Sequence, residues 1–296
     1  MSHAPTSPSS LSAVRNVGSL VKFSHTIFAL PFALAAVVLA LPTGAFTWSK
    51  LLLIVLAIAS ARTAAMAFNR LVDRDIDAEN PRTRDREIPR GVLTPGFVRA
   101  LVLGSCAAFV VCSALLGRLP LLLSPLALAL ALGYSYVKRF SSLCHLVLGA
   151  AIAFAPGGAW IAVGAPVTLA PWLLVLAVAS WVAGFDVLYS LQDESFDREA
   201  GLHSIPARVG TRGALWLSGM LHVVTVACLF GTGLVLARGT AFYVGCAVVA
   251  AILVYEHALV RPGDLSKLDK AFFDLNGYVS VAFFACVLAD HLLRAV

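Results

Sequence analysis

Residues 50–77, KLLLIVLAIASARTAAMAFNRLVDRDID, decide the fold of this chain. They begin with an apolar run that is long enough to span a bilayer, because an α-helix rises about 1.5 Å per residue across about 30 Å of hydrocarbon. The run ends in Asn69, Asp73 and Asp77, which recur at every fourth position and therefore lie on one face of a helix. The stretch predicts a membrane helix whose polar end carries an acidic stripe.

The whole chain repeats this apolar pattern. Of its 296 residues, 59% are hydrophobic and only 13% are charged, which is more apolar than a water-soluble domain. The sequence therefore predicts an all-α, polytopic membrane protein with nine transmembrane helices. The runs lie at 21–41, 50–72, 98–117, 119–137, 143–163, 169–192, 213–236, 240–260 and 271–293.

Basic residues predict the orientation, because short loops rich in Lys and Arg stay in the cytoplasm. With the amino terminus inside, one side receives Arg15, Lys22, loop 73–97, Lys138, Arg139, loop 198–212, Arg261, Lys267 and Lys270. The other side receives only Lys50, Arg118, Arg238 and Arg294. We therefore expect an inner-membrane protein whose amino terminus and acidic helix ends are cytoplasmic.

The formal net charge of +6 comes from these loops and does not predict nucleic-acid binding. Residues 1–12 are rich in Ser and Pro and are predicted to be a disordered tail, followed by one transmembrane domain over 13–296. No signal-peptide pattern precedes the first span, so we expect that span to be retained.

The cysteines and the isolated histidines do not predict a metal site or a disulfide framework. The six cysteines lack the spacing of a zinc site or a disulfide framework, so we interpret them as packing residues. His145, His222, His257 and His291 also read as packing positions, and His25 and His203 have no assignable role.

A second acidic stripe ends the sixth predicted span. Asp186, Tyr189, Asp193 and Asp197 share one helix face, at the same predicted side of the membrane as the first stripe. Four converging carboxylates would repel each other strongly unless cations neutralise them. Magnesium accepts carboxylates together with phosphate oxygens, so the two stripes predict a magnesium–diphosphate site.

The alternative interpretation is that these groups are solvated helix ends, salt-bridged to Arg70, Arg74 and Arg198. Either stripe alone leaves the two interpretations about equal. Matching stripes at equivalent helix ends, 120 residues apart, favour the metal site.

Further ionisable residues extend the two stripes. Arg62 and Asp186 lie two turns deeper in their spans, where ionisable groups are costly and usually functional. Arg82 and Arg86 lie in a loop whose guanidinium groups suit phosphate, although a positive-inside signal would look similar. Another pair, Tyr134 and Lys138, lies one turn apart at the end of the fourth span. It suits the same diphosphate, although an interfacial tyrosine beside a snorkelling lysine has the same pattern.

Taken together, these residues resemble the motifs of the UbiA superfamily of intramembrane prenyltransferases. The matching motifs are Asn69-x3-Asp73-x3-Asp77, Arg82-Thr83-x2-Arg86-x2-Pro89-x-Gly91, Tyr134-x3-Lys138, and Tyr189-x3-Asp193-x3-Asp197 followed by Gly201-x2-Ser204-x-Pro206. The resemblance implies a nine-helix bundle around a central cavity with a lateral opening. It also implies two Mg²⁺ ions that bridge the diphosphate of a polyprenyl diphosphate donor.

Within the superfamily the chain is most similar to 4-hydroxybenzoate polyprenyltransferases and to their relatives in the futalosine route to menaquinone. The stretches Arg62–Arg70 and Arg86–Pro89 carry this resemblance, while Glu87 and Arg90 depart from the common pattern. The resemblance implies transfer of a polyprenyl group to a small aromatic acid in ubiquinone or menaquinone biosynthesis. A dihydroxynaphthoate-type acceptor is the alternative.

The predicted roles are as follows. Arg62 pairs with the acceptor carboxylate, and Asp186 orients or deprotonates its phenol. The metal is held by Asn69, Asp73, Asp77, Asp193 and Asp197, the diphosphate by Arg82, Arg86, Lys138 and Tyr189, and the reaction centre by Asp186, Arg62, Lys138 and Tyr134.

A transporter and a non-catalytic membrane scaffold are the two alternative classes of protein. Paired intramembrane charges also mark transporters, but here the carboxylates gather at one membrane face, not at the midplane. A non-catalytic membrane scaffold would not need matched acidic stripes. The sequence predicts neither the prenyl chain length nor the oligomeric state.

Overall fold

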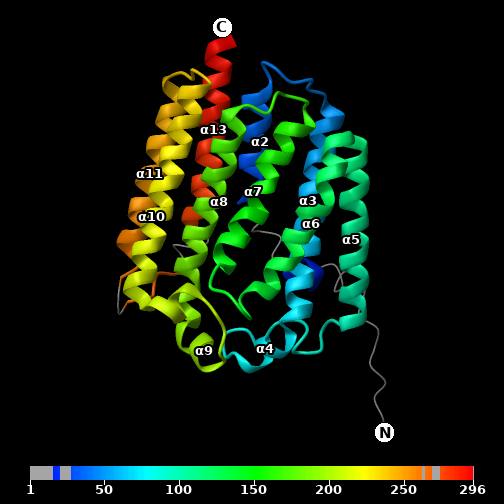
Figure 1. Ribbon diagram of the computed structural model, residues 1–296, viewed down its shortest axis with the longest axis vertical. Coiled ribbons are helices and arrows are strands. Elements are labelled where there is room, and N and C mark those ends of the chain that lie inside the picture. The colour runs from blue at the N-terminus through cyan, green and yellow to red at the C-terminus, as the bar shows by residue number, and fades with distance from the viewer. Residues whose placement is uncertain (1–15, 21–27, 262–263, 269–273, 296) are drawn as a thin grey trace.

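The computed structural model is a bundle of helices (Figure 1). It describes residues 16–20, 28–261, 264–268 and 274–295, and within these ranges it contains no β-strand, only an isolated bridge between Arg261 and Asp264. The predicted tail 1–12 and His25 lie outside the described residues. That residues 13–296 form a single domain stays a prediction.

The helices follow the predicted runs closely. They are α2 (Ala29–Ala40), α3 (Trp48–Val72), α4 (Arg74–Glu79), α5 (Pro95–Leu116), α6 (Arg118–Val137), α7 (Cys144–Ala162), α8 (Leu169–Tyr189), the 3₁₀ helix η2 (Ser190–Asp193), α9 (Glu194–Glu199), α10 (Ile205–Val235), α11 (Thr240–Leu259) and α13 (Asn276–Ala295).

Eight of the described helices are long and apolar enough to cross a membrane. They correspond to eight of the nine predicted runs, and the all-α membrane fold is confirmed. The remaining run, 21–41, is represented by α2, since residues 21–27 lie outside the described part. Gly117, at a φ of 137°, separates α5 from α6 in a single-residue turn. That positive φ suits glycine, which explains how two spans follow each other so closely.

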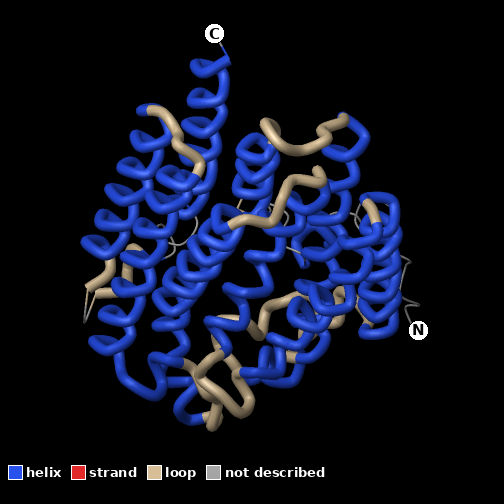
Figure 2. The backbone as a smooth tube through the Cα atoms, turned by 45° about the horizontal axis from the view of Figure 1, so that its top comes forward, coloured by secondary structure: helices blue, strands red, loops and turns tan. Residues whose placement is uncertain are grey.

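Two ends of the bundle differ in polarity. The short helices α4 and α9 lie at its lower end in Figure 1, together with the connections 80–94, 138–143 and 200–204. Most of the described Lys and Arg residues outside the spans lie in these connections. The tube view of Figure 2 shows the described chain as helices joined by loops, without a strand. The lower end is called the polar end below.

The core lies around α8. Trp181 of this helix is fully buried and packs against Phe32 of α2 and Phe185, with ring centroids 5.0 and 5.1 Å away. Large side chains on the outer helices instead face outwards, among them Leu103 on α5 and Leu122 on α6, which are 71% and 64% exposed. Such an apolar exterior suits lipid, which solvates these side chains as well as a protein core does.

A buried polar network joins α8 to α10, α11 and α13. Trp181 Nε1 donates to Asn276 Oδ1 at 2.8 Å, and Asn276 Nδ2 donates to Glu256 Oε1 at 2.8 Å. Nearby, His222 Nδ1 and His257 Nε2 are 3.0 Å apart. These contacts link α8, α10, α11 and α13 by hydrogen bonds that have no competing water. The two histidines therefore belong to a buried polar network between helices.

Close helix packing makes Gly149 of α7 a sensitive position. A Cβ there would lie 2.2 Å from the backbone oxygen of Ala179 on α8, whereas a Cβ at Gly158 of the same helix would meet nothing within 4 Å. We expect Gly149→Ala to destabilise the protein by about 1–3 kcal/mol, because α8 must move to admit the methyl group.

The measurement is thermal unfolding of the purified protein in detergent, with Gly158→Ala as the matched control. Gly158→Ala should match or slightly exceed the wild-type midpoint, because alanine favours a helix over glycine. Equal midpoints for the two variants would contradict the close approach of α7 and α8.

Candidate active site at the polar end

Each acidic stripe contains a break in its helix. Asp73 lies between α3 and α4 with φ −89° and ψ 5°, and Asp193 is the last residue of η2, directly before α9, with φ −101° and ψ 5°. This bridge region of φ/ψ space is sparsely populated and often contains active-site residues. Each predicted stripe therefore crosses a break between two helices. The four-residue spacing nevertheless survives, since the N–H groups of Asp73 and Asp77 donate to the carbonyl oxygens of Asn69 and Asp73.

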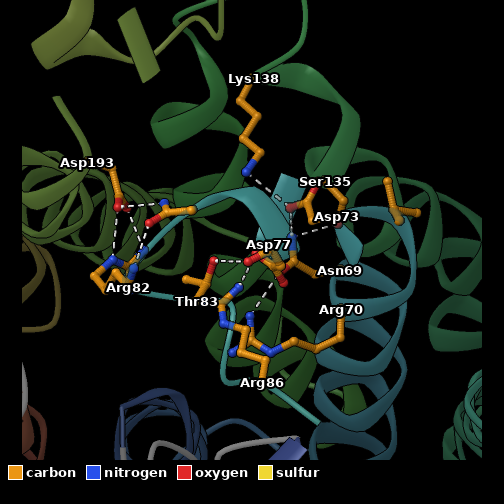
Figure 3. Close-up of polar contacts among 12 residues, drawn as sticks. Asn69, Arg70, Asp73, Asp77, Arg82, Thr83, Arg86, Ser135, Lys138 and Asp193 are labelled. Carbon is orange, nitrogen blue, oxygen red and sulfur yellow. Dashed lines mark hydrogen bonds and ion pairs between the residues drawn. The ribbon is translucent and has the colours of Figure 1, made fainter. Parts of the chain in front are cut away.

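Asp73 lies at the centre of a charged cluster that joins α3 to the end of α6 (Figure 3). Its carboxylate is 3.2 Å from Lys138 Nζ and 3.0 Å from an Arg139 nitrogen. Asn69 Nδ2 donates to the same carboxylate at 2.9 Å and to Ser135 Oγ at 3.4 Å. Only 3% of the Asp73 side chain is exposed, so these donors replace the water that the carboxylate would otherwise bind.

Asp77 is held by the loop that follows α4. Its Oδ1 accepts from Arg86 at 2.7 Å, and its backbone oxygen accepts from Thr83 Oγ1 at 3.1 Å. The other carboxylate oxygen, Oδ2, is buried and has no hydrogen-bond partner among the described residues. A buried carboxylate oxygen without a partner is costly, so this atom is a candidate ligand for a cation.

Asp193, at the second acidic helix end, is contacted by the same loop. Arg82 binds it in a bidentate manner, with Nε 2.9 Å from Oδ1 and a terminal nitrogen on Oδ2, and Asn80 Nδ2 donates to Oδ1 at 3.0 Å. The Arg82 guanidinium also lies over the Tyr189 ring, 5.5 Å from its centroid. The loop therefore links the two acidic helix ends, as Figure 3 shows.

These ion pairs differ from those of a solvated surface. The partners of the buried carboxylates are Lys138, Arg139, Arg86 and Arg82, not Arg70, Arg74 or Arg198. Arg74 instead pairs with Asp75, whose side chain is 82% exposed. Only the charges outside the stripes fit the interpretation of solvated helix ends.

The charge of Arg82 is stabilised by its place in the site. Burial by itself would lower the pKa of its guanidinium, but the hydrogen bonds and the charge of Asp193 outweigh burial and raise it. Arg82 is thus a permanent cation beside Asp193 and Tyr189.

A mostly apolar cavity of about 440 Å³ lies inside the bundle, next to the charged cluster. Its walls come from α2, α3, α5, α6, α7 and α8, and they include Arg62 and Tyr134 as polar groups. Arg62 Nε is buried and has no hydrogen-bond partner among the described residues. The cavity wall therefore contains a guanidinium group whose buried Nε lacks a partner among the described residues, and such a group suits a carboxylate ligand.

Asp186 has a partner that the sequence analysis assigned to packing. His145 Nδ1 lies 2.7 Å from Asp186 Oδ2, and His145 is 3% exposed. His145 precedes Asp186 by 41 residues and lacks any motif spacing, so only the packing of α7 against α8 shows the contact.

The predicted residues thus fall into three groups. Asn69, Asp73 and Lys138 form one cluster, Asp77 and Arg86 a second, and Asp193, Arg82 and Tyr189 a third. Asp197 lies within α9, is 8% exposed, and is close to the third group in sequence. Within the described residues, no three His, Cys, Asp or Glu side chains are grouped closely enough to hold a metal ion. The metal-binding roles therefore stay predictions.

The structure adds residues that the prediction did not include. Ser135, Arg139, Asn80 and Thr83 all hydrogen-bond to members of the two stripes. Arg139 and Asn80 adjoin the predicted motifs, so proximity in sequence was an available signal for them. Arg70 also belongs here, since its NH1 lies 3.4 Å from Asn69 Oδ1 and 6% of the residue is exposed.

Comparison with known proteins places this arrangement in a family. The model of the UbiA prenyltransferase family matches residues 29–286. The 4-hydroxybenzoate octaprenyltransferase of Chromohalobacter salexigens is 34% identical, over 79% of this chain and 78% of its own length. The corresponding protein of Vibrio parahaemolyticus is 28% identical, over 90% of each chain.

Solved structures agree with this match. The apo structure of a UbiA homolog from Aeropyrum pernix K1 superposes with a TM-score of 0.82 at 36% identity, over 90% of this chain and 98% of that one. A UbiA homolog from Archaeoglobus fulgidus bound to GPP and Mg²⁺ has a TM-score of 0.74 at 19% identity, over 94% of this chain and 99% of that one. The second likeness concerns the fold alone.

The loop between α4 and α5 should depend on Arg82. We expect Arg82→Gln to increase amide hydrogen exchange over residues 80–90 by about 10-fold, because a bidentate charged hydrogen bond contributes about 1.5–3 kcal/mol. The measurement is hydrogen–deuterium exchange followed by mass spectrometry.

Arg84→Gln is the matched control, since Arg84 lies in the same loop and its side chain has no hydrogen bond or ion pair among the described residues. If both variants exchange equally, the Arg82–Asp193 contact does not hold the loop.

Proposed function

The chain belongs to the UbiA prenyltransferase family, and we propose that it transfers a polyprenyl group from a polyprenyl diphosphate to a small aromatic acid of the 4-hydroxybenzoate type. The observation that carries this proposal is the pair of acidic helix ends at one end of an apolar cavity, where cationic side chains form ion pairs with their carboxylates. Names of the relatives support the acceptor, because they are 4-hydroxybenzoate octaprenyltransferases.

We infer that the reaction depends on Mg²⁺, held as two ions by Asn69, Asp73, Asp77, Asp193 and Asp197. These residues fit such ions, because they offer only oxygen ligands and because the buried Oδ2 of Asp77 lacks a partner among the described residues. A magnesium-bound relative with this fold adds support. Bound Mg²⁺ supplies charge neutralisation for the diphosphate leaving group.

The cationic side chains would then exchange partners. Arg82, Arg86 and Lys138 are 31%, 23% and 30% exposed, whereas the carboxylates of Asp77 and Asp73 are 5% and 3% exposed. Cations thus lie nearer the solvent than the carboxylates they neutralise. We propose that these three side chains turn to phosphate oxygens when the donor binds, and Tyr189 hydrogen-bonds there as well.

The cavity would hold the two reacting groups away from water. Its apolar walls suit the prenyl chain, and Arg62 on its wall binds the acceptor carboxylate. Asp186 of α8, whose side chain is 24% exposed, accepts the phenol proton. Tyr134, which also lines the cavity, helps to place the acceptor next to the diphosphate. Water exclusion matters because the allylic carbon would otherwise be hydrolysed.

The balance of bonds is simple. The allylic carbon–oxygen bond breaks, and pyrophosphate leaves with its electron pair. A ring carbon of the acceptor then forms the new carbon–carbon bond. The hydrogen of that ring carbon moves as a proton to the phenolic oxygen when the ring becomes aromatic again, so the one proton released overall is the phenol proton that Asp186 accepts.

A dihydroxynaphthoate-type acceptor of the menaquinone route is the second candidate, favoured by the resemblance of Arg62–Arg70 to those relatives. We further propose that the polar end faces the cytoplasm of an inner membrane, because it carries most of the basic loops. Membership of a prenyltransferase family weighs against the transporter and scaffold alternatives.

One assay tests the proposal directly. The full chain in detergent receives Mg²⁺, a labelled polyprenyl diphosphate and either 4-hydroxybenzoate or a dihydroxynaphthoate, and labelled product is separated by chromatography. A prenylated hydroxybenzoate supports the proposal. Product from the naphthoate alone would favour the second candidate, and no product from either acid would contradict both.

The metal-binding prediction has a matched control beside the first stripe. We expect Asp73→Asn and Asp193→Asn each to lower Mg²⁺-dependent transfer by roughly 100-fold or more, because each removes a charge at the leaving group. Asp75→Asn should stay within about 2-fold, since this exposed carboxylate lies outside the stripe. Near-normal transfer by Asp73→Asn or Asp193→Asn would contradict the metal site.

Arg62 should act on the acceptor alone. We expect Arg62→Ala to raise the KM for 4-hydroxybenzoate by about 10-fold or more, the worth of one charged hydrogen bond, and to leave the donor KM within about 2-fold. The variant should also lose the preference of the wild type for 4-hydroxybenzoate over its methyl ester. Equal increases in both KM values would exclude the role of Arg62 in acceptor binding.

A further inference from the structure

His145 occupies a fully defined position beside the candidate reaction centre. It lies in the first turn of α7, and its two ring nitrogens contact two other segments of the chain. Nδ1 is 2.7 Å from Oδ2 of Asp186 on α8, and Nε2 accepts a hydrogen bond from the backbone N–H of Ile205, at the start of α10, at 3.2 Å. One side chain therefore joins α7, α8 and α10.

These contacts decide which nitrogen carries the proton. A backbone N–H only donates, so Nε2 of His145 must offer its lone pair to Ile205. In the neutral ring the proton then lies on Nδ1 and points at Asp186. Asp186 thus receives a hydrogen bond whose direction is set by the backbone of α10.

The start of α10 is itself anchored to the rest of the site. Its capping residue Ser204 accepts from the N–H of Ala207, and the N–H of His203 donates to the backbone oxygen of Lys138 at 2.7 Å. Lys138 is the residue that pairs with Asp73. His145 therefore rests on the same segment that supports the charged cluster.

Asp186 keeps one oxygen for another partner. His145 binds Oδ2, and no other side chain of the described residues hydrogen-bonds to Asp186. The Asp186 side chain is 24% exposed, whereas that of His145 is 4% exposed. The carboxylate is thus fixed on its buried side and open on the other.

We propose that His145 is a positioning residue, which orients Asp186 so that its free oxygen Oδ1 accepts the hydrogen bond of the acceptor hydroxyl. This inference rests on the proposed function, because it assigns the open side of Asp186 to the aromatic acceptor. His145 acts through Asp186 and does not touch the donor, whose diphosphate belongs to the metal and cationic groups at the helix ends. Its loss should therefore change acceptor kinetics and leave donor kinetics unchanged.

Three variants test this role in the full chain in detergent. His145→Ala removes both contacts, whereas His145→Gln keeps a donor and an acceptor at a separation close to that of the two ring nitrogens, but cannot carry a proton onward. We expect His145→Ala to lower acceptor kcat/KM by about 30-fold with the donor KM within about 2-fold, and His145→Gln to recover to within about 3-fold of the wild type. His291→Ala, at the opposite end of the bundle, is the matched control and should behave as the wild type.

A double-mutant cycle separates this role from a purely structural one. In an Asp186→Asn background, we expect His145→Ala to cost less than about 3-fold, because its effect passes through the carboxylate. Thermal unfolding midpoints identify any variant that has failed to fold. For such a variant, His145→Gln with a wild-type midpoint provides the comparison.

The inference is overturned if His145→Ala transfers as fast as the wild type, if it raises the donor and acceptor KM values equally, or if its full loss persists beside Asp186→Asn. A folded His145→Gln variant as slow as His145→Ala would also overturn it, since the ring itself would then be required. All these outcomes presuppose a wild-type enzyme that prenylates the aromatic acid. Absence of any wild-type product would instead refute the proposed function.

Discussion

The buried charge of Asp73 is the constraint on which the polar end of this protein depends. A carboxylate with 3% of its side chain exposed is stable only when donors replace its water, and here they are Lys138, Arg139 and Asn69. Two of these donors come from the end of α6, so neutralising one charge also joins α3 to α6. Arg82 on Asp193 and Arg86 on Asp77 extend the same principle through the loop after α4.

This balance of charge suits the chemistry proposed for the site. Each cation that now neutralises a carboxylate is also a phosphate ligand, and each carboxylate is also a magnesium ligand. Arrival of a metal–diphosphate therefore needs an exchange of partners and no large change in net charge. The apolar cavity next to these ion pairs has Arg62 on its wall, and the buried Nε of Arg62 has no partner among the described residues. Acceptor recognition by Arg62 is therefore separate from donor recognition by the cations at the helix ends.

The fold was largely predictable because the bilayer restricts a chain to few solutions. A spanning segment must satisfy its own backbone hydrogen bonds, so an apolar run such as 50–72 can only be a helix, and its length follows from the thickness of the hydrocarbon. Helix breaks at Asp73 and Asp193 were not predictable in the same way. Helical periodicity runs through both positions, so the spacing along the chain does not mark the break.

The sequence by itself determined which residue types lie at the polar helix ends, since the four-residue spacing of the acidic stripes and the basic loops between the spans are local patterns. Only the tertiary structure decided the partners: that Arg82 reaches Asp193 over 111 residues, that Lys138 and Arg139 share Asp73, and that His145 supports Asp186. Hydrogen bonds and ion pairs act over a few ångströms in space, and the packing of the helices, not their spacing along the chain, brings these groups within that range.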